Sequence, residues 1–277
     1  MNPRPVERLE KTLARIAKEQ GLAQERLRRW VSFLALCGVL ERAVTEGILE
    51  NYDLKGGVAL ELRFAERART TKDIDIGVPG QREKRLLAFQ NAVALGFDDF
   101  TFQVKGKPLN MDKVDAVRLE LAIRYRTRAW QTIDVDLGLS GSSAVEFVVP
   151  TIRGVAAMGL LVPSPVRCMN LSEQVAQKLH ACTGPYSQGR ARDVLDILLI
   201  DLLGKLDLLA VREAAERVFA ARGTHYFPPA ILIPVGWRPE LEALAKELGY
   251  PTTSAAEIEV RFRAFVAQLG GEKTAVR

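Results

Sequence analysis

The chain reads Lys55-Gly56-Gly57-Val58-Ala59-Leu60-Glu61-Leu62 and, after a short interval, Thr71-Lys72-Asp73-Ile74-Asp75-Ile76. Gly56 and Gly57 predict a tight turn whose bare backbone N–H groups can approach a phosphate. A short helix and then a strand that carries two acids are expected to follow. This order predicts a site for a nucleoside triphosphate and a divalent metal ion.

Asp73 and Asp75 are predicted to share one face of that strand. Side chains alternate along a strand, so the two Cα atoms lie roughly 6.6 Å apart at about 3.3 Å per residue. Ile74, Ile76 and Val78 form the opposite, core-facing row. Mg²⁺ is commonly held by one or two carboxylates together with substrate phosphates. A solvated strand face is the alternative for a DxD pattern, and the preceding glycine turn favours the metal site.

A second strand with the same alternation is expected at 129–137. Its acids, Asp134 and Asp136, alternate with apolar residues. If this strand lies near the first, Asp134 or Asp136 completes a carboxylate triad and shares a second metal ion or accepts a proton from an attacking hydroxyl. The sequence leaves open which acid does so, and a solvated outer face is the alternative.

Two helices follow in the second half of the chain. Asn170 or Ser172 is expected to cap a helix that runs through about Cys182. Lys178 flanks the apolar stripe of this helix. It is either a solvated residue or, on a face that meets the substrate, a point charge for triphosphate oxygens.

The next helix, through 194–203, is apolar on nearly every face, which predicts that it is buried. Asp193 and Asp196 lie in its first turns, where the helix dipole favours acids. An acid on a buried helix needs a charged partner, and Lys178 or Arg192 is expected to provide it.

Together these motifs resemble the nucleotidyltransferase superfamily and, more narrowly, the AbiEii/AbiGii toxin family with its MenT-type members. The resemblance is carried by KGGVALEL with RTTKDIDI, by Glu173–Ala181 and by Arg192–Ile197. These motifs span about 50–205, and their order is more specific than any one of them.

The resemblance implies an enzyme that transfers a nucleoside monophosphate from an NTP to the 3′ acceptor end of tRNA and so blocks translation. It implies Mg²⁺ as cofactor and a separately encoded cognate antitoxin as partner. The expected site residues are Asp73, Asp75 and Asp134 for the metal, Lys55, Gly56, Gly57 and Lys178 for the nucleotide, and Lys178 and Asp193 as further active-site residues. Neither the nucleobase nor the set of tRNAs can be read from these residues.

One position departs from the superfamily pattern. Many nucleotidyltransferases have serine after the glycines, whereas this chain has Val58. Backbone N–H groups, with Lys55 or Lys178, are therefore expected to hold the triphosphate.

Composition fits an intracellular enzyme. A hydrophobic fraction of 48% is ample for a sizeable core. The three cysteines show no metal-ligand spacing, and an odd count argues against a disulfide framework, so a reducing compartment is expected. Because no apolar run approaches the roughly 20 residues that a membrane span needs, a cytoplasmic protein with no membrane partner is predicted. Only two histidines occur, which excludes a histidine-rich zinc site.

The net charge of +5 permits a nucleic-acid partner without requiring one. Two basic clusters flank the acids and could steer a polyanion such as tRNA. They comprise Arg63, Arg67, Arg69 and Lys72, and Arg118, Arg124, Arg126 and Arg128.

The expected fold class is α+β, with a small mixed nucleotidyltransferase-like β-sheet core and helices, followed by a mainly α-helical C-terminal half. Two domains are predicted. The first, 1–160, holds N-terminal helices over 5–50 and the nucleotidyltransferase core, and the second is the helical segment 161–277. Alternative functions are a nucleotidyltransferase that modifies a protein or a small molecule, and a noncatalytic nucleotide-binding or nucleic-acid-binding module.

Overall fold

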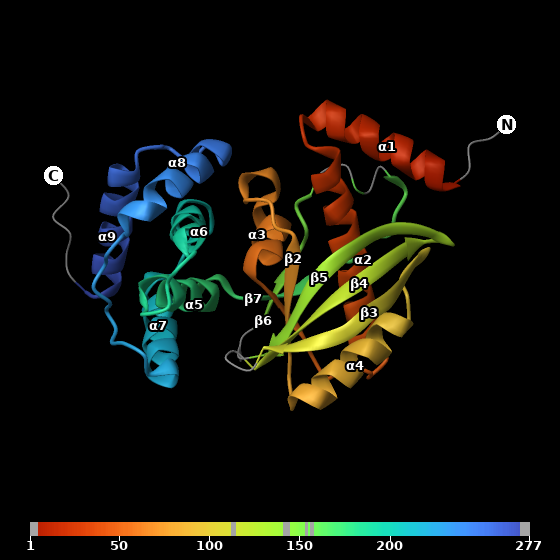
Figure 1. Cartoon of the computed structure of the whole chain (residues 1–277), viewed down its shortest axis with the longest axis horizontal. Coiled ribbons are helices and arrows are strands. Elements are labelled where there is room, and N and C mark those ends of the chain that lie inside the picture. Colours follow the sequence, from red (N-terminus) through yellow and green to blue (C-terminus); the bar gives the residue numbers. More distant parts are fainter. Residues whose placement is uncertain (1–4, 112–114, 141–144, 153–154, 156–157, 272–277) are drawn as a thin grey trace. The chain divides into compact units, whose positions relative to one another are not determined.

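The computed structural model describes residues 5–111, 115–140, 145–152, 155 and 158–271 (Figure 1). The chain forms two compact units. Unit 1 comprises Met1–Ala65 and Thr70–Met169, and unit 2 comprises Glu66–Arg69 and Asn170–Arg277. The prediction of domains 1–160 and 161–277 stays a prediction.

Unit 1 is built on a mixed sheet, in which the described strands are ordered β3-β4-β5-β2-β1-β7-β6. Strand β2 runs parallel to β5 and antiparallel to β1, while β1 runs parallel to β7. The predicted mixed sheet is therefore confirmed. The strands are β1 (Asp53–Lys55), β2 (Asp73–Val78), β3 (Phe100–Met111), β4 (Ala116–Tyr125), β5 (Arg128–Leu139), β6 (Val145–Val148) and β7 (Val166–Met169).

Helices cover the apolar face of this sheet. Helices α2 and α4 contact each other and the central strands, as Figure 1 shows for the red and yellow segments beside β3–β5. Apolar residues of β2 and β5, such as Ile74, Ile76 and Val135, are buried in the same core as Trp30 and Leu34 of α2. The helices of unit 1 are α1 (Pro5–Gln20), α2 (Gln24–Thr45), α3 (Gly56–Phe64) and α4 (Arg82–Ala94), with a 3₁₀ turn, η1, over Ala65–Arg67 at the change between units.

Unit 2 is helical in its described part. Helix α6 contacts α5, α8 and α9, which explains why it is apolar on nearly every face. The helices are α5 (Leu171–Thr183), α6 (Ala191–Leu203), α7 (Leu208–Arg222), α8 (Arg238–Glu247) and α9 (Ala255–Leu269), with the 3₁₀ turn η4 at Val235–Trp237. None of the described helices combines the length and the apolar character that crossing a membrane requires.

The start of α5 shows how a local sequence signal sets an element boundary. The Asn170 side chain accepts a hydrogen bond of 2.7 Å from the backbone N–H of Glu173. This bond satisfies one of the unpaired N–H groups at the helix start. Of the two residues that the sequence offered, Asn170 is therefore the cap, and Ser172 lies inside the helix.

Candidate active site

The pairing of β2 with β5 gathers the predicted acids on one face of the sheet. Asp73 lies opposite Asp134, and Asp75 lies opposite Asp136, in a parallel register. Paired residues on neighbouring strands, which are about 4.8 Å apart, direct their side chains to the same face. The apolar residues between them are buried on the other face. The two acid-bearing strands thus meet the condition that a shared site requires, because they are neighbours in the sheet.

The two glycines begin α3 directly beside these acids. Gly56 has a φ of +60°, and a Cβ atom there would lie 2.0 Å from Oδ2 of Asp75. A Cβ atom on Gly57 would lie 2.7 Å from Cβ of Thr71. Only glycine fits both the backbone conformation and the space at position 56. The start of α3 thus lies next to an acid of β2.

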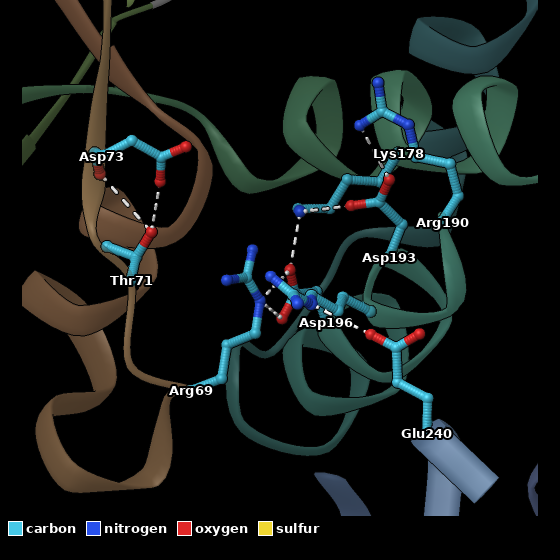
Figure 2. Close-up of polar contacts among 9 residues, drawn as sticks. Arg69, Thr71, Asp73, Lys178, Arg190, Asp193, Asp196 and Glu240 are labelled. Carbon is cyan, nitrogen blue, oxygen red and sulfur yellow. Dashed lines mark hydrogen bonds and ion pairs between the residues drawn. The ribbon is translucent and has the colours of Figure 1, made fainter. Parts of the chain in front are cut away.

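Asp73 has a neighbour that holds its carboxylate. The hydroxyl of Thr71 donates a hydrogen bond of 2.7 Å to Oδ1 of Asp73, as Figure 2 shows. Thr71 is only 3% exposed. Thr71 lies within a predicted motif, but its role could not be predicted because a hydroxyl two residues before an acid is not distinctive.

The structure separates the two acids of β5. Arg118 donates hydrogen bonds of 2.7 and 2.5 Å to the two carboxylate oxygens of Asp136. These bonds and the charge of Asp136 raise the pKa of Arg118. The Asp134 carboxylate is exposed and interacts with Arg118 less strongly than Asp136 does. Asp134 is therefore more accessible to a cation than Asp136, which Arg118 already binds.

Lys55 directs its ammonium along the sheet. Its Nζ donates a hydrogen bond of 2.7 Å to the carbonyl of Leu139 and lies 3.9 Å from Oδ2 of the fully buried Asp53. Leu139 pairs with Val78, at the opposite end of β2 from Asp73. Whether Lys55 reaches a nucleotide stays a prediction.

The donor set fits one kind of metal site. No group of three or more His, Cys, Asp or Glu side chains is arranged to hold a metal ion among the residues that the structure describes. A site made of protein ligands alone is thus not formed by these side-chain positions. Mg²⁺ needs only one or two carboxylates when substrate phosphates and water supply the remaining oxygens. Asp73 and Asp75, with Asp134 beside Asp73, meet that requirement.

Unit 2 contains the second group of predicted residues. Nζ of Lys178, on α5, donates hydrogen bonds of 2.8 Å to Asp193 and 2.7 Å to Asp196, both on α6 (Figure 2). All three residues are buried. Lys178 is therefore the charged partner that the acids of this helix needed. Arg192, the other candidate, pairs with Glu240 at 3.0 Å.

Opposing effects decide the charges in this group. Burial alone would lower the pKa of Lys178, but the carboxylates of Asp196 and Asp193 outweigh it and raise the pKa. Burial alone would raise the pKa of Asp196, but Lys178 and Arg69 lower it. The ammonium and the Asp196 carboxylate are thus both charged at neutral pH.

Arg69 is a second partner of Asp196, which the sequence did not indicate. Its Nε lies 3.2 Å from each carboxylate oxygen of Asp196. The sequence placed Arg69 among the arginines expected to steer a polyanion. A buried carboxylate needs more than one hydrogen-bond donor. Only this requirement could have indicated that Asp196 pairs with a second cation besides Lys178.

Many of the other flanking arginines also have acidic partners. The ion pairs are Arg63–Glu146, Arg118–Asp136, Arg126–Asp99 and Arg128–Glu7. Arg67, Lys72 and Arg124 are exposed. The charge that remains for a polyanion is therefore smaller than the count of arginines indicates.

Comparison with known proteins places the chain in a family. The family described as "Nucleotidyl transferase AbiEii toxin, Type IV TA system" matches residues 39–275. A search of the curated proteins found no match. Among solved structures, MenT4, a nucleotidyltransferase toxin from Mycobacterium tuberculosis H37Rv, aligns with a TM-score of 0.61 and 17% identity over 96% of this chain and 90% of its own.

A second solved structure is the antibiotic-resistance factor ANT(2″)-Ia, with a TM-score of 0.41 and 19% identity over 70% of this chain and 94% of its own. At such identities the likeness to MenT4 concerns the fold, and it agrees with the α+β architecture predicted from the sequence. The family match covers most of the chain and includes both groups of predicted residues. The chain belongs to the AbiEii family of nucleotidyltransferase toxins.

Proposed function

We propose that this protein transfers a nucleoside monophosphate from an NTP to the 3′ acceptor end of tRNA and thereby blocks translation. The observation that carries the proposal is the parallel register of β2 and β5, which sets Asp73 and Asp75 opposite Asp134 and Asp136 on one face. The start of α3 at Gly56 lies beside these acids. Family membership supports the reaction class.

In this proposal, Asp73, Asp75 and Asp134 hold Mg²⁺. Bound Mg²⁺ would stabilise the charge that develops on the phosphate oxygens and lower the pKa of the attacking hydroxyl. Thr71 keeps the Asp73 carboxylate in one orientation through its hydrogen bond. Asp134, which is exposed, is the acid that can also accept the proton of the attacking 3′ hydroxyl.

The chain offers two kinds of donor to a triphosphate. Glycine at positions 56 and 57, where α3 begins, leaves room for an anion to approach the backbone closely. Lys178 uses two of its three N–H groups on Asp193 and Asp196, which leaves a third for a phosphate oxygen. We assign Lys178 to nucleotide binding on this basis, and Asp193, as a further active-site residue, holds its ammonium. Lys55 remains a further candidate.

We also propose a cognate antitoxin as protein partner and the cytoplasm as the site of action. Membership of a toxin family supports the antitoxin. Restraint by a partner is consistent with an enzyme whose acids already share one face of the sheet.

Extension of tRNA tests the proposal directly. Purified protein is incubated with Mg²⁺, total tRNA and each of the four NTPs in turn, and the RNA is resolved by gel electrophoresis. We expect longer tRNA with at least one NTP. Parallel reactions with α-labelled NTP, bulk protein and a small antibiotic distinguish an alternative acceptor. If the folded protein labels none of these acceptors, nucleotidyl transfer to tRNA, protein or the small molecule is excluded.

A further inference from the structure

Asp196 joins two cations in the core of unit 2. It is fully buried, and its carboxylate accepts hydrogen bonds from Nε of Arg69 and from Nζ of Lys178. Figure 2 shows the carboxylate of Asp196 between these two side chains, with Asp193 on the other side of the lysine. Arg69 comes from a segment more than a hundred residues earlier in the chain.

Charge balance explains why the arginine is needed. Lys178 alone faces two carboxylates, Asp193 and Asp196. An isolated buried carboxylate is strongly unfavourable, so Asp196 without Arg69 would depend on the ammonium for all its compensation. With Arg69 in place, two cations balance two anions, and the lysine keeps part of its positive potential for another anion. Arg190 adds a weaker contact of 3.4 Å to Asp193.

Geometry leads to the same conclusion. A lysine side chain has four rotatable bonds, and fixing its ammonium costs conformational entropy. Asp193 and Asp196 hold Nζ of Lys178 from two directions. They can fix the ammonium only if their own carboxylates are held in place. Arg69, whose side chain lies mostly out of solvent, fixes the carboxylate of Asp196 through its contacts to both oxygens.

We infer that Arg69 and Asp196 are positioning residues for Lys178, holding its ammonium so that its third N–H is presented to an oxygen of a nucleoside triphosphate. The inference rests on the proposed role of Lys178 in nucleotide binding. Neither Arg69 nor Asp196 touches the nucleotide in this account. Both act through the position and the charge of the lysine.

Nucleotide binding to the full-length protein, measured by calorimetric titration with each NTP and Mg²⁺, tests the inference without requiring turnover. We expect Arg69→Met to weaken binding roughly tenfold, the scale of one lost charge-assisted contact. Arg69→Lys keeps the positive charge but lacks the planar guanidinium group. It should therefore bind NTP more tightly than Arg69→Met but less tightly than the wild type. Arg192→Met is the matched control, since it removes an exposed ion pair from α6, the helix that carries Asp196.

A double variant separates positioning from folding. Arg69→Met with Asp196→Asn removes both charges, so it should unfold at a higher temperature than Arg69→Met alone while still binding NTP weakly, because the lysine has lost its fixed partner. If Arg69→Met lowers the unfolding midpoint but binds NTP as tightly as the wild type does, Arg69 is structural only and the inference is wrong. The same conclusion follows if Arg192→Met weakens binding as much as Arg69→Met does.

The two proposals can fail separately. If the wild type binds NTP with the expected dependence on Arg69 but labels no acceptor, the positioning inference stands and the proposed function does not. If tRNA is extended and NTP affinity is unchanged in Arg69→Met and in Lys178→Met, the function stands and the inference is overturned.

Discussion

At the scale of single residues, Gly56 lets the start of α3 lie close to the carboxylate of Asp75. Two physical effects oppose any side chain here. The φ of +60° is unfavourable for an L-residue, and a Cβ atom would displace the carboxylate of Asp75. The first effect acts on stability, and the second acts on the site.

Gly56→Ala should therefore lose both stability and function. We expect the free energy of unfolding to fall by about 1–2 kcal/mol from the backbone strain, and NTP-dependent transfer to fall further because Asp75 moves. Gly21→Ala is a matched control, since Gly21 has a φ of +65° and no atom within 4 Å of its missing Cβ. Urea unfolding and transfer assays compare them. Equal activity in the two variants would contradict the assigned role of Gly56.

The acids of β5 make a second prediction at this scale. Asp134→Asn should reduce transfer by roughly a hundredfold or more, as expected for loss of a metal ligand or general base. Asp136→Asn should reduce it much less, because Asp136 is already paired with Arg118. Rates at saturating NTP and Mg²⁺ measure the difference. The opposite order of the two variants would make Asp136 the third acid.

At the scale of elements, periodicity and capping predicted much of the structure. The apolar and acidic alternation at 73–78 and 129–137 predicted both strands, since burial of one face enforces a period of two. The N-terminal helices over 5–50, the short α3 and the buried α6 were also predicted correctly. The choice between Asn170 and Ser172 could not be made, because either side chain can cap a helix at this spacing.

The cap of α5 gives a stability prediction. Asn170→Ala removes the hydrogen bond to the N–H of Glu173 and should lower the free energy of unfolding by about 1 kcal/mol. Ser172→Ala, inside the helix, should change it by less than about 0.5 kcal/mol. Denaturant unfolding of both variants measures the effect. A larger loss from Ser172→Ala would show that the cap is assigned wrongly.

A directed chain of hydrogen bonds joins α5 to the end of α7. Because Arg222 can only donate, Nδ1 of His180 accepts from it, and Nε2–H of His180 then donates to the hydroxyl of Thr224. Thr224 donates to Nδ1 of His225, which donates in turn through Nε2–H to Thr183. Both imidazoles are neutral in this arrangement.

Acid should weaken this part of unit 2. Burial is the largest effect and, together with the charge of Arg222 and the nearness of His225, lowers the pKa of His180 from 6.5 to about 4. The unfolded chain therefore binds a proton at a higher pH than the folded chain does, so stability falls as pH decreases from about 6.5 to about 4. Thermal unfolding across this range measures the slope, and His180→Asn should flatten it. An unchanged slope in that variant would assign the acid sensitivity to other groups.

At the scale of the whole molecule, the sequence lacked information about long-range partners. Contacts between distant segments, rather than local patterns, determine that β5 lies beside β2. The same is true of the pairing of Arg69 with Asp196. The count of arginines likewise overstated the charge available to a polyanion, because ion pairs such as Arg63–Glu146 neutralise part of it. The order of the three motifs along the chain nevertheless indicated the family. Each motif belongs to a helix or strand that positions a polar side chain.

The central claim is that the carboxylates of β2 make this chain a nucleotidyltransferase. The most direct test is transfer of an α-phosphate label from NTP to tRNA, measured for the wild type, Asp75→Asn and Asp136→Asn at matched fractions of folded protein. The account predicts labelled tRNA with the wild type, at least about a hundredfold less with Asp75→Asn, and a much smaller loss with Asp136→Asn. Labelling by Asp75→Asn at the rate of the wild type would contradict it.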